Sequence, residues 1–309
     1  MRIPLFGFLS LCLLLSLCFG DAAEATETYP LKLTDGRGDT VLLERLPQRI
    51  VSLAPSVTEL LVELGVEERL VGVTRHCELP GGESITRLEV FPDVSVEALL
   101  ALDADLVIGA DITSPATAMR LRDFGVPLLV VPGFGLDALQ SDFLLVGKAV
   151  GAGKRAAALA DSLVAARSSV AASVQANLAE RPKVVMALGV DNAYFVGESV
   201  YADGLLREAG GRNIGAQSGA AWPQLSKEFL LREQPEILFI SSELEVGELS
   251  RLSAERIESL QKHPFWKHIE AVQKGQVVEV NAGYFSIPGP RVEQLLLDLH
   301  RWIIRFGKT

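Results

Sequence analysis

The chain has 309 residues, of which 39 are acidic and 29 are basic, so its formal net charge is −10 at pH 7. This acidic balance argues against nucleic acid as a partner, because proteins that bind nucleic acid present basic surfaces. About 285 residues would remain after removal of an N-terminal leader, which is enough for one large domain or two of ordinary size.

Residues 1–23 have the layout of a secretory signal peptide. Arg2 precedes an apolar run that extends from Leu5 to Phe19, and small residues follow it. The run is short for a membrane span, although an uncleaved anchor is the alternative interpretation. We therefore expect an exported protein, with cleavage between residues 20 and 25.

Two of the three cysteines lie in this leader. Cys18 suggests a lipoprotein site, but Leu17 stands before it, where lipoprotein processing requires a small residue, so lipid anchoring is the less favoured alternative. Removal of the leader leaves Cys77 alone, and a single cysteine cannot form an internal disulfide. The stability of the chain must then come from its core.

Residues 24–153 show a regular alternation of strands and helices. Turn residues between alternating apolar positions predict a hairpin at 28–48. Apolar runs and helical spacing then predict strands at 49–54, 70–74, 105–110 and 127–133, with helices at 57–65, 97–103, 113–124 and 137–150. This rhythm is typical of a mostly parallel sheet with helices on its faces.

Residues 154–181 predict one long helix. The segment from Lys154 to Glu180 is rich in alanine and contains neither proline nor glycine, and Pro182 ends it. At 1.5 Å per residue such a helix would be roughly 40 Å long. A surface helix and a strut between two lobes both fit this pattern.

Residues 182–309 repeat the α/β rhythm and form a second lobe. Strands are expected at 183–190, 235–240 and 276–281, and helices at 200–211, 226–233, 252–275 with a break at Pro264, and 289–307. The sequence therefore predicts an α/β protein with two lobes joined by one long helix.

One stretch of the first lobe recurs in the second. FPDVSVEALLALDADLVI, residues 91–108, aligns without a gap with WPQLSKEFLLREQPEILF, residues 222–239. The alignment places Phe91 over Trp222 and Glu97 over Glu228. In both copies a serine is expected to cap a helix whose first turn carries the glutamate, where a carboxylate suits the helix dipole.

Several motifs along the chain resemble those of the class III periplasmic substrate-binding proteins, and most closely the type that binds vitamin B12. These motifs are GVTRHCELP (72–80), VSVEALLALDADLVI (94–108), WPQLSKEFL (222–230), HPFWKHIEAVQKGQV (263–277) and YFSIPGPRVEQLL (284–296). Proteins of this class serve ATP-driven importers of cobalamin, ferric siderophores and haem. The resemblance covers nearly all of the chain after the leader.

The resemblance implies two Rossmann-like lobes with mostly parallel sheets, bridged by a rigid backbone helix that allows only small closure. It implies a periplasmic monomer whose partners are an ABC permease and its ATPase. Members of the class present one glutamate from each lobe to arginines of the permease, and Glu97 and Glu228 stand where those glutamates are expected. A permease with two-fold symmetry would explain why the stretch recurs.

The resemblance also implies a ligand held between the lobes by aromatic faces with few polar contacts. The expected ligand-binding residues are those on loops at the carboxyl ends of strands: Pro55, Ser56, His76, Phe91, Tyr194, Phe195, Trp222, Tyr284 and Phe285. His76 is also the candidate metal ligand, since imidazole binds cobalt and iron. The sequence departs from the pattern at His76, where an aromatic is usual, and at Gly283 and Ile287, where charged residues are common.

These features favour a non-enzymatic receptor without a covalently bound cofactor, whose ligand is a metal chelate. A corrinoid ranks first, because an anionic siderophore would require several arginines in the cleft; a ferric siderophore ranks second and haem third. A chelatase-like enzyme of two α/β lobes is the catalytic alternative, although it would need neither a signal peptide nor paired glutamates. A zinc or manganese receptor would need three clustered histidines, and the four histidines here are scattered.

Overall fold

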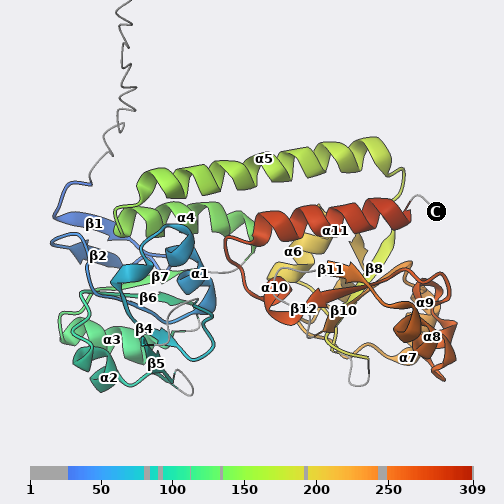
Figure 1. Ribbon diagram of the computed structural model, residues 1–309, viewed down its shortest axis with the longest axis horizontal. Helices are drawn as coiled ribbons and strands as arrows, with labels where there is room; N and C mark the ends of the chain where they lie inside the picture. The colour runs from blue at the N-terminus through green and yellow to red at the C-terminus, as the bar shows by residue number, and fades with distance from the viewer. Residues whose placement is uncertain are drawn as a thin grey trace, which may run out of the picture.

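The computed structural model describes residues 27–79, 84–89, 93–111, 113–132, 135–190, 194–242 and 249–307 (Figure 1). The predicted signal peptide, Cys18 and Phe91 lie outside the described residues. Two lobes lie side by side beneath one long helix, which confirms the predicted fold class.

The N-lobe, residues 27–149, is built on a parallel five-stranded sheet in the order β5-β4-β3-β6-β7. The four strands β3, β4, β6 and β7 are mostly apolar and buried because helices cover both faces of the sheet, whereas the edge strand β5 exposes Thr86 and Arg87. An antiparallel hairpin of β1 and β2 packs beside it. The elements are β1 Leu31–Thr34, β2 Thr40–Leu43, β3 Ile50–Ser52, α1 Pro55–Glu63, β4 Leu70–Thr74, β5 Thr86–Leu88, α2 Val96–Ala101, β6 Leu106–Ala110, α3 Pro115–Asp123, β7 Leu128–Val131 and α4 Leu136–Ala149.

The C-lobe, residues 183–307, has a five-stranded sheet in the order β11-β12-β10-β8-β9. All its pairs are parallel except that of β11 with β12. Its elements are β8 Lys183–Ala187, α6 Tyr201–Glu208, β9 Arg212–Asn213, α7 Lys227–Glu233, β10 Ile237–Ser242, β11 Leu249–Arg251, α8 Ala254–Lys262, α9 Glu270–Gln273, β12 Val277–Asn281, α10 Ala282–Ser286 and α11 Val292–Gly307. The short elements β5, β9, β11 and α10 were not expected, since two to five residues are too few to show a period.

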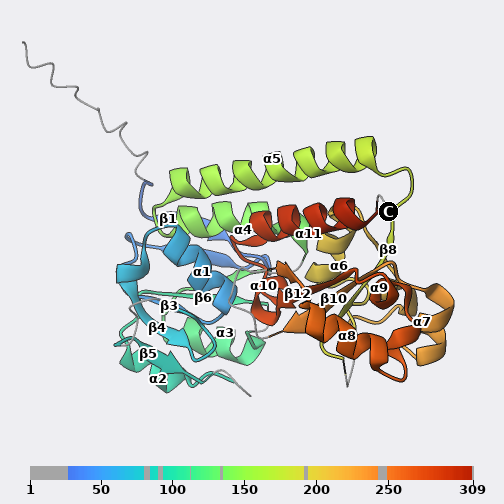
Figure 2. The same cartoon turned by 45° about the vertical axis from the view of Figure 1, so that its right-hand side comes forward.

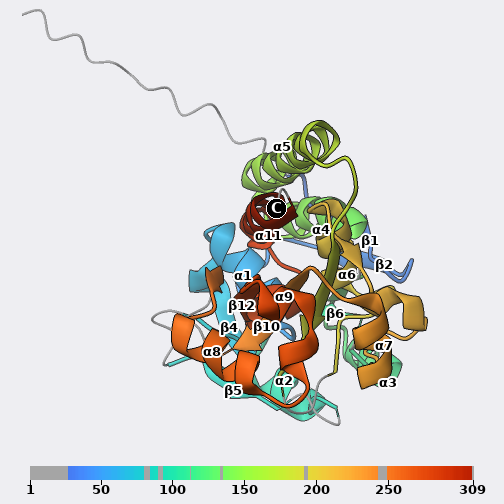
Figure 3. The same cartoon turned by 90° about the vertical axis from the view of Figure 1, so that its right-hand side faces the viewer.

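The helix α5, Gly153–Asn177, runs over both lobes, and the turned views of Figures 2 and 3 show it on the same side as α4 and α11. At 25 residues it is roughly 38 Å long. It packs on α4 of the N-lobe and on α11 of the C-lobe. Among the described residues α5 is the helix whose length and composition would allow it to cross a membrane. Here its apolar face is buried against the two lobes, as a bridging helix requires.

Arg167, near the middle of α5, links this helix to both lobes. Its guanidinium donates to Asp137 of α4 at 2.6 Å and to both carboxylate oxygens of Glu208 in α6 at 2.6 and 2.8 Å. The hydrogen bond to Glu208, with the nearby charges, raises the pKa of Arg167 further above its ordinary value. The bridge is thus held by charge as well as by apolar packing.

The recurring stretch has the same local structure in both lobes. Ser95 and Ser226 each accept a hydrogen bond from the backbone N–H three residues later, at 3.1 Å in both cases. The helices α2 and α7 that follow are succeeded by Asp103 and Gln234, and both residues have a φ of 49°. A non-glycine residue in the left-handed region is uncommon, so this shared feature shows that the repeat extends to the backbone.

The repeat also includes the strand that lies beside each copy. Arg49 before β3 and Lys183 at the start of β8 point their side chains at carbonyl groups where α2 and α7 end, at 2.8 and 2.7 Å. A cation suits that end of a helix. Their backbone N–H groups donate to Asp105 and Glu236, both at 2.8 Å. Each copy therefore holds its helix, its loop and the neighbouring strand in one arrangement.

Candidate ligand cleft

A cavity of about 130 Å³ lies between the lobes and is lined from both sides. It lies beyond the carboxyl ends of β3, β4 and β12, which is where ligands of parallel sheets bind. The N-lobe contributes Pro55, Glu59, His76 and Glu78, and the C-lobe contributes Asn281, Gly283, Ile287 and Arg291. This position makes it the candidate ligand site, and we refer to it as the interlobe cavity.

An ion pair crosses the interlobe cavity. Arg291, directly before α11, donates from Nε to Glu59 Oε2 of α1 at 3.0 Å, and its second donor meets the other carboxylate oxygen. The side chains of Glu59 and Arg291 are 16% and 29% exposed. The guanidinium also lies over the ring of Tyr284, 5.6 Å from its centre. Two-point pairing of this kind fixes the geometry of both groups.

Burial controls the ionisation of the groups around this pair. It raises the pKa of Glu59 above the ordinary glutamate value; Arg291 opposes this effect, and the charge of Glu78 adds to it. Burial likewise raises the pKa values of Tyr201 and Tyr284, so both phenols stay protonated. The Tyr201 hydroxyl is buried and has no hydrogen-bond partner in the described part of the chain.

The two lobes also approach each other closely at Gly289, beside this pair. A Cβ at this position would lie 3.0 Å from Glu59 Oε2 and 3.7 Å from the Cα of Ser56. Ser56 follows Pro55 in the first turn of α1 and is half-buried. It therefore lies next to the interlobe cavity, although it does not line it.

His76 is exposed at the rim of the interlobe cavity, where its Nε2 accepts a hydrogen bond from Arg75 Nε at 3.3 Å. Over the described ranges no group of three or more His, Cys, Asp or Glu side chains is arranged to hold a metal ion. A metal ligand role for His76 stays a prediction. The thiol of its neighbour Cys77 is buried and forms hydrogen bonds with the hydroxyl groups of Thr58 and Thr74, at 3.0 and 3.2 Å.

Tyr194 and Trp222 are exposed on neighbouring segments beyond the carboxyl end of β8. The segments pair in antiparallel fashion, with Tyr194 opposite Gln224, and the N–H of Phe195 donates to the carbonyl of Pro223 at 2.9 Å. Tyr194 is 46% and Trp222 is 41% exposed, while Leu188 beside them is 40% exposed. The N–H of Leu188 donates to the carbonyl of Tyr194 at 2.8 Å, so the three exposed side chains stand on adjoining segments, here named the β8 ledge. None of them lines the interlobe cavity, but together they offer apolar surface to a flat ligand.

Phe195, Tyr284 and Phe285 were expected at the cleft, but the structure places their side chains in the core, at most 2% exposed. Phe195 turns inward because it alternates with the exposed Tyr194 along an extended segment. Tyr284 and Phe285 do not lie in a loop: Asn281 caps the short helix α10, accepting a hydrogen bond from the N–H of Tyr284 at 3.0 Å. That helix directs both rings behind the surface of the interlobe cavity.

Four residues that line the interlobe cavity were missed by the sequence analysis: Glu59, Glu78, Asn281 and Arg291. Arg291 belongs to the motif YFSIPGPRVEQLL, but nothing in its sequence neighbours indicates that its side chain faces the cleft. Glu59 stands one helical turn after Pro55, a spacing that places both on one face of α1. That spacing is the signal that could have found it.

Glu97 and Glu228 are both exposed in the first turn of their helices. A hydrogen bond from the backbone, then those from Ser95 and Arg120, lower the pKa of Glu97. Arg120 of α3 forms an ion pair with Glu97, whereas Glu228 has no ion pair among the residues that the structure describes. The two equivalent carboxylates therefore differ in their surroundings.

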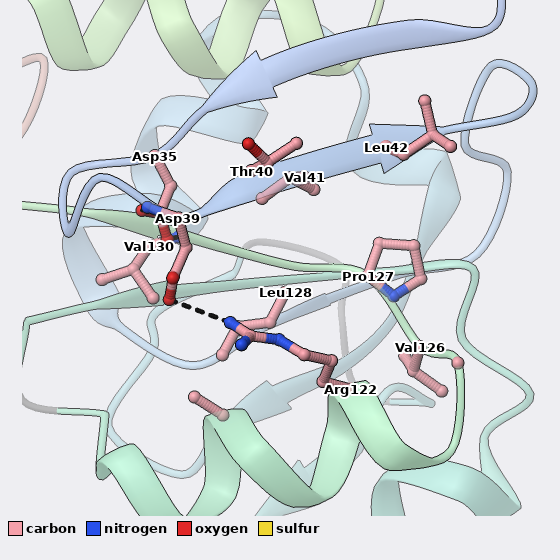
Figure 4. A pocket seen from close by; sticks show the side chains of 12 residues that line it. Asp35, Asp39, Thr40, Val41, Leu42, Arg122, Val126, Pro127, Leu128 and Val130 are labelled. Carbon is pink, nitrogen blue, oxygen red and sulfur yellow. Dashed lines mark hydrogen bonds and ion pairs between the residues drawn. The ribbon is translucent and has the colours of Figure 1, made fainter.

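Three larger hollows lie outside the interlobe cavity. Figure 4 shows one of about 210 Å³ between the β1–β2 hairpin and α3, where Arg122 lies 3.0 Å from Asp39. Asp35, the second carboxylate that lines this hollow, already accepts hydrogen bonds from the backbone N–H groups of Arg37, Asp39 and Val130. The second, of about 1020 Å³, is an open groove along α5 next to Arg167, lined by α4 of the N-lobe and α6 of the C-lobe. The third, of about 350 Å³, lies in the C-lobe beside α8. None of the three shares a lining residue with the interlobe cavity.

Comparison with known proteins is consistent with this geometry. The family model for periplasmic binding proteins matches residues 50–283. A cobalamin-binding protein of Halobacterium salinarum is 26% identical over 276 residues, covering 87% of this chain and 73% of that protein. The apo structure of the periplasmic heme-binding protein RhuT from Roseiflexus sp. RS-1 has a TM-score of 0.69 at 26% identity, covering 84% of this chain and 99% of that one. The vitamin B12-binding protein BtuF of Vibrio cholerae shares the fold, with a TM-score of 0.69 at 22% identity, covering 85% of this chain and 99% of that one.

Proposed function

This chain belongs to the periplasmic binding protein family, and we propose that it is the solute-binding component of an ABC importer that captures a corrinoid between its lobes. The observation that carries the proposal is the interlobe cavity, whose one lining arginine is already paired with Glu59. The β8 ledge adds exposed aromatic surface for a flat macrocycle.

Charge favours a corrinoid over the two alternatives within the family. Ferric siderophores of the anionic kind and the propionates of haem carry negative charge, which Glu78 would repel, while Arg291 is already paired with Glu59. A corrin ring carries amide side chains, which are neutral and donate hydrogen bonds to carboxylates. The names of the relatives do not decide the question, because they include a cobalamin-binding and a heme-binding protein.

Haem, which ranks third on the sequence alone, becomes the second candidate because of the position of His76. An imidazole exposed at the rim of the interlobe cavity has the chemistry of an axial ligand to haem iron. A haem receptor of this kind would show a visible spectrum of bound haem that changes in a His76→Ala variant.

Delivery to the permease is the second half of the proposed function. We place the docking surface at α2 and α7, where Glu97 and Glu228 are exposed at equivalent positions of the two lobes. The proposed setting is the periplasm and the proposed receptor is a monomer. A binding role is preferred to catalysis because the family consists of solute-binding proteins.

The test is a titration of the purified protein with cobalamin, haem and a ferric siderophore, followed by calorimetry and by quenching of tryptophan fluorescence. We expect saturable binding of the corrinoid at one site per chain. Tighter binding of haem or of the siderophore would contradict the proposed ligand, and failure of all three would contradict the whole proposal.

A further inference from the structure

Among the residues that the structure describes, four ionisable groups face the interlobe cavity, and they come from three parts of the chain. Glu59 comes from α1, His76 and Glu78 from the loop after β4, and Arg291 from the segment before α11. Arg75 lies directly behind His76 and donates to its ring at 3.3 Å. Two carboxylates and two guanidinium groups therefore decide the charge that a ligand meets.

Both guanidinium groups have carboxylate partners of their own. Arg291 is held by Glu59 at two points inside the cleft. Arg75 lies 3.1 Å from Glu89, on the outer surface, where their side chains are 57% and 65% exposed. An anionic group of a ligand would have to displace a protein carboxylate to reach Arg291, so the described lining of the cavity offers anions no unpaired guanidinium.

Glu78 is the remaining charge. It is exposed at the cavity, and its carboxylate has no hydrogen bond or ion pair within the ranges that the structure describes. It lies close enough to Glu59 for its charge to act on that residue. The surface presented to a ligand is thus negative, with Glu78 as its unneutralised group.

This charge distinguishes between two kinds of corrinoid. A complete cobalamin carries a phosphodiester in its nucleotide loop, and this negative charge offsets the positive charge at the cobalt. A corrinoid without the nucleotide loop keeps the positive charge. Opposite charge across an interface favours binding, and like charge opposes it.

We infer that Glu78 is a specificity-determining residue that makes the cleft prefer cationic corrinoids without a nucleotide loop over complete cobalamins. The inference rests on the proposed corrinoid function and narrows its substrate class. Because Glu78 is exposed, its effect is that of a solvated charge pair, about two-fold to five-fold in the ratio of the two affinities.

The experiment measures, by calorimetry, the affinity of the full mature chain for cobinamide with one cyanide and one water as axial ligands, which carries a charge of about +1, and for cyanocobalamin, whose phosphodiester makes it neutral. Wild-type protein is compared with Glu78→Gln and with a control, Glu68→Gln, which removes an equally exposed carboxylate that does not line the cavity. Wild-type protein should bind cobinamide more tightly. The Glu78→Gln variant should lose about two-fold to five-fold of this preference, and the control should keep it.

Salt provides an independent measurement, because added salt screens an exposed charge. The preference of the wild-type protein should decrease as ionic strength rises, and that of Glu78→Gln should change little. An unchanged affinity ratio in Glu78→Gln, or tighter binding of cobalamin by the wild type, would overturn the inference and leave the proposed function standing. Binding of neither corrinoid would overturn both.

Discussion

Arg291 and Glu59 are separated by 232 positions in the sequence, yet they form a two-point ion pair that joins the lobes inside the cleft. The pKa of Glu59 is raised in spite of this partner, so the cost of burying the carboxylate exceeds the stabilisation from the guanidinium. The two halves of the pair should therefore respond differently to mutation.

Arg291→Met should destabilise the protein by about 1–3 kcal/mol at neutral pH, because it leaves a buried carboxylate without its counterion. Glu59→Gln should have a smaller effect, since an amide keeps the shape and removes the buried charge. Urea unfolding measures both. Adding Glu59→Gln to Arg291→Met should recover part of the loss, and a double variant that lost the sum of both effects would contradict this account.

The pH dependence of the same pair follows from the direction of the shift. A raised carboxyl pKa means that the folded state binds the proton more tightly than the unfolded chain does. The contribution of Glu59 is then most favourable below its ordinary pKa of 4.5 and declines as pH rises through the raised value. The deficit of Arg291→Met should shrink on acidification, which unfolding curves collected from pH 4 to pH 7 would reveal.

Asp93 is predicted to behave in the opposite way. The hydroxyls of Ser114 and Thr117 donate to its carboxylate, both at 2.6 Å, and these bonds lower the pKa of Asp93. Its stabilisation is present above the ordinary aspartate pKa of 3.8 and is lost as pH falls through the lowered value. Asp93→Asn should cost about 1 kcal/mol at neutral pH, a modest figure because the group is exposed.

The difference between wild type and Asp93→Asn should close in acid. Asp161→Asn, an exposed substitution on α5, is the control and should match the wild type at each pH. A gap that stayed constant with pH would show that the carboxylate of Asp93 is not responsible.

Trp222→Ala should weaken corrinoid binding by about two-fold to ten-fold, because the ligand would lose one aromatic face of the β8 ledge. Trp222→Phe should keep most of the affinity and lose most of the fluorescence quenching. Trp302, which packs against Phe306 on α11, provides the matched control. If Trp302→Phe removed the quenching and Trp222→Phe did not, the ledge would not be the ligand surface.

The double variant Glu97→Ala and Glu228→Ala should abolish stimulation of the ATPase by the liganded receptor in reconstituted membranes, with ligand affinity unchanged. The prediction rests on the equal placement of the two carboxylates after Ser95 and Ser226. Glu180→Ala, at an exposed site after α5, should have no effect. Full stimulation by the double variant would exclude these helices as the docking surface.

Closure of the lobes on ligand binding should be small, because α5 is anchored to both lobes through Arg167. Small-angle scattering should show almost the same radius of gyration with and without ligand. Arg167→Ala, which removes the contacts to Asp137 and Glu208, should increase the difference. A large contraction of the wild-type protein would contradict a rigid bridge.

The sequence predicted those parts of the structure that depend on local patterns. The repeat correctly predicted two serine N-caps and two glutamates in the first turns of the following helices. Capping could be predicted because it involves residues only three positions apart in the chain. The absence of proline and glycine predicted α5, which ends at Asn177, before Glu180. The composition of this segment fitted both a surface helix and a strut; the bridge was predicted from the α/β lobes on either side and from the family resemblance, and the packing of α5 on α4 and α11 agrees with it.

The cleft was predicted less well, because its residues meet only in three dimensions. Tyr284 and Phe285 have the composition of a binding loop, yet the turn of α10 directs both rings into the core. Glu59 and Arg291 carry no local mark of their pairing, since residues so far apart become neighbours only when both lobes are folded. Charge in a cleft between lobes is thus hidden from a sequence pattern.

The distance between Glu59 and Arg291 along the chain also means that the two residues are synthesised at different times. A ribosome that adds about 5–20 residues per second needs on the order of ten to fifty seconds to make the residues between them. The N-lobe emerges with half of an ion pair and half of a cavity, and the last helix must arrive before either is complete. A nascent chain stalled before Arg291 should already contain a folded N-lobe and still be unable to retain the ligand.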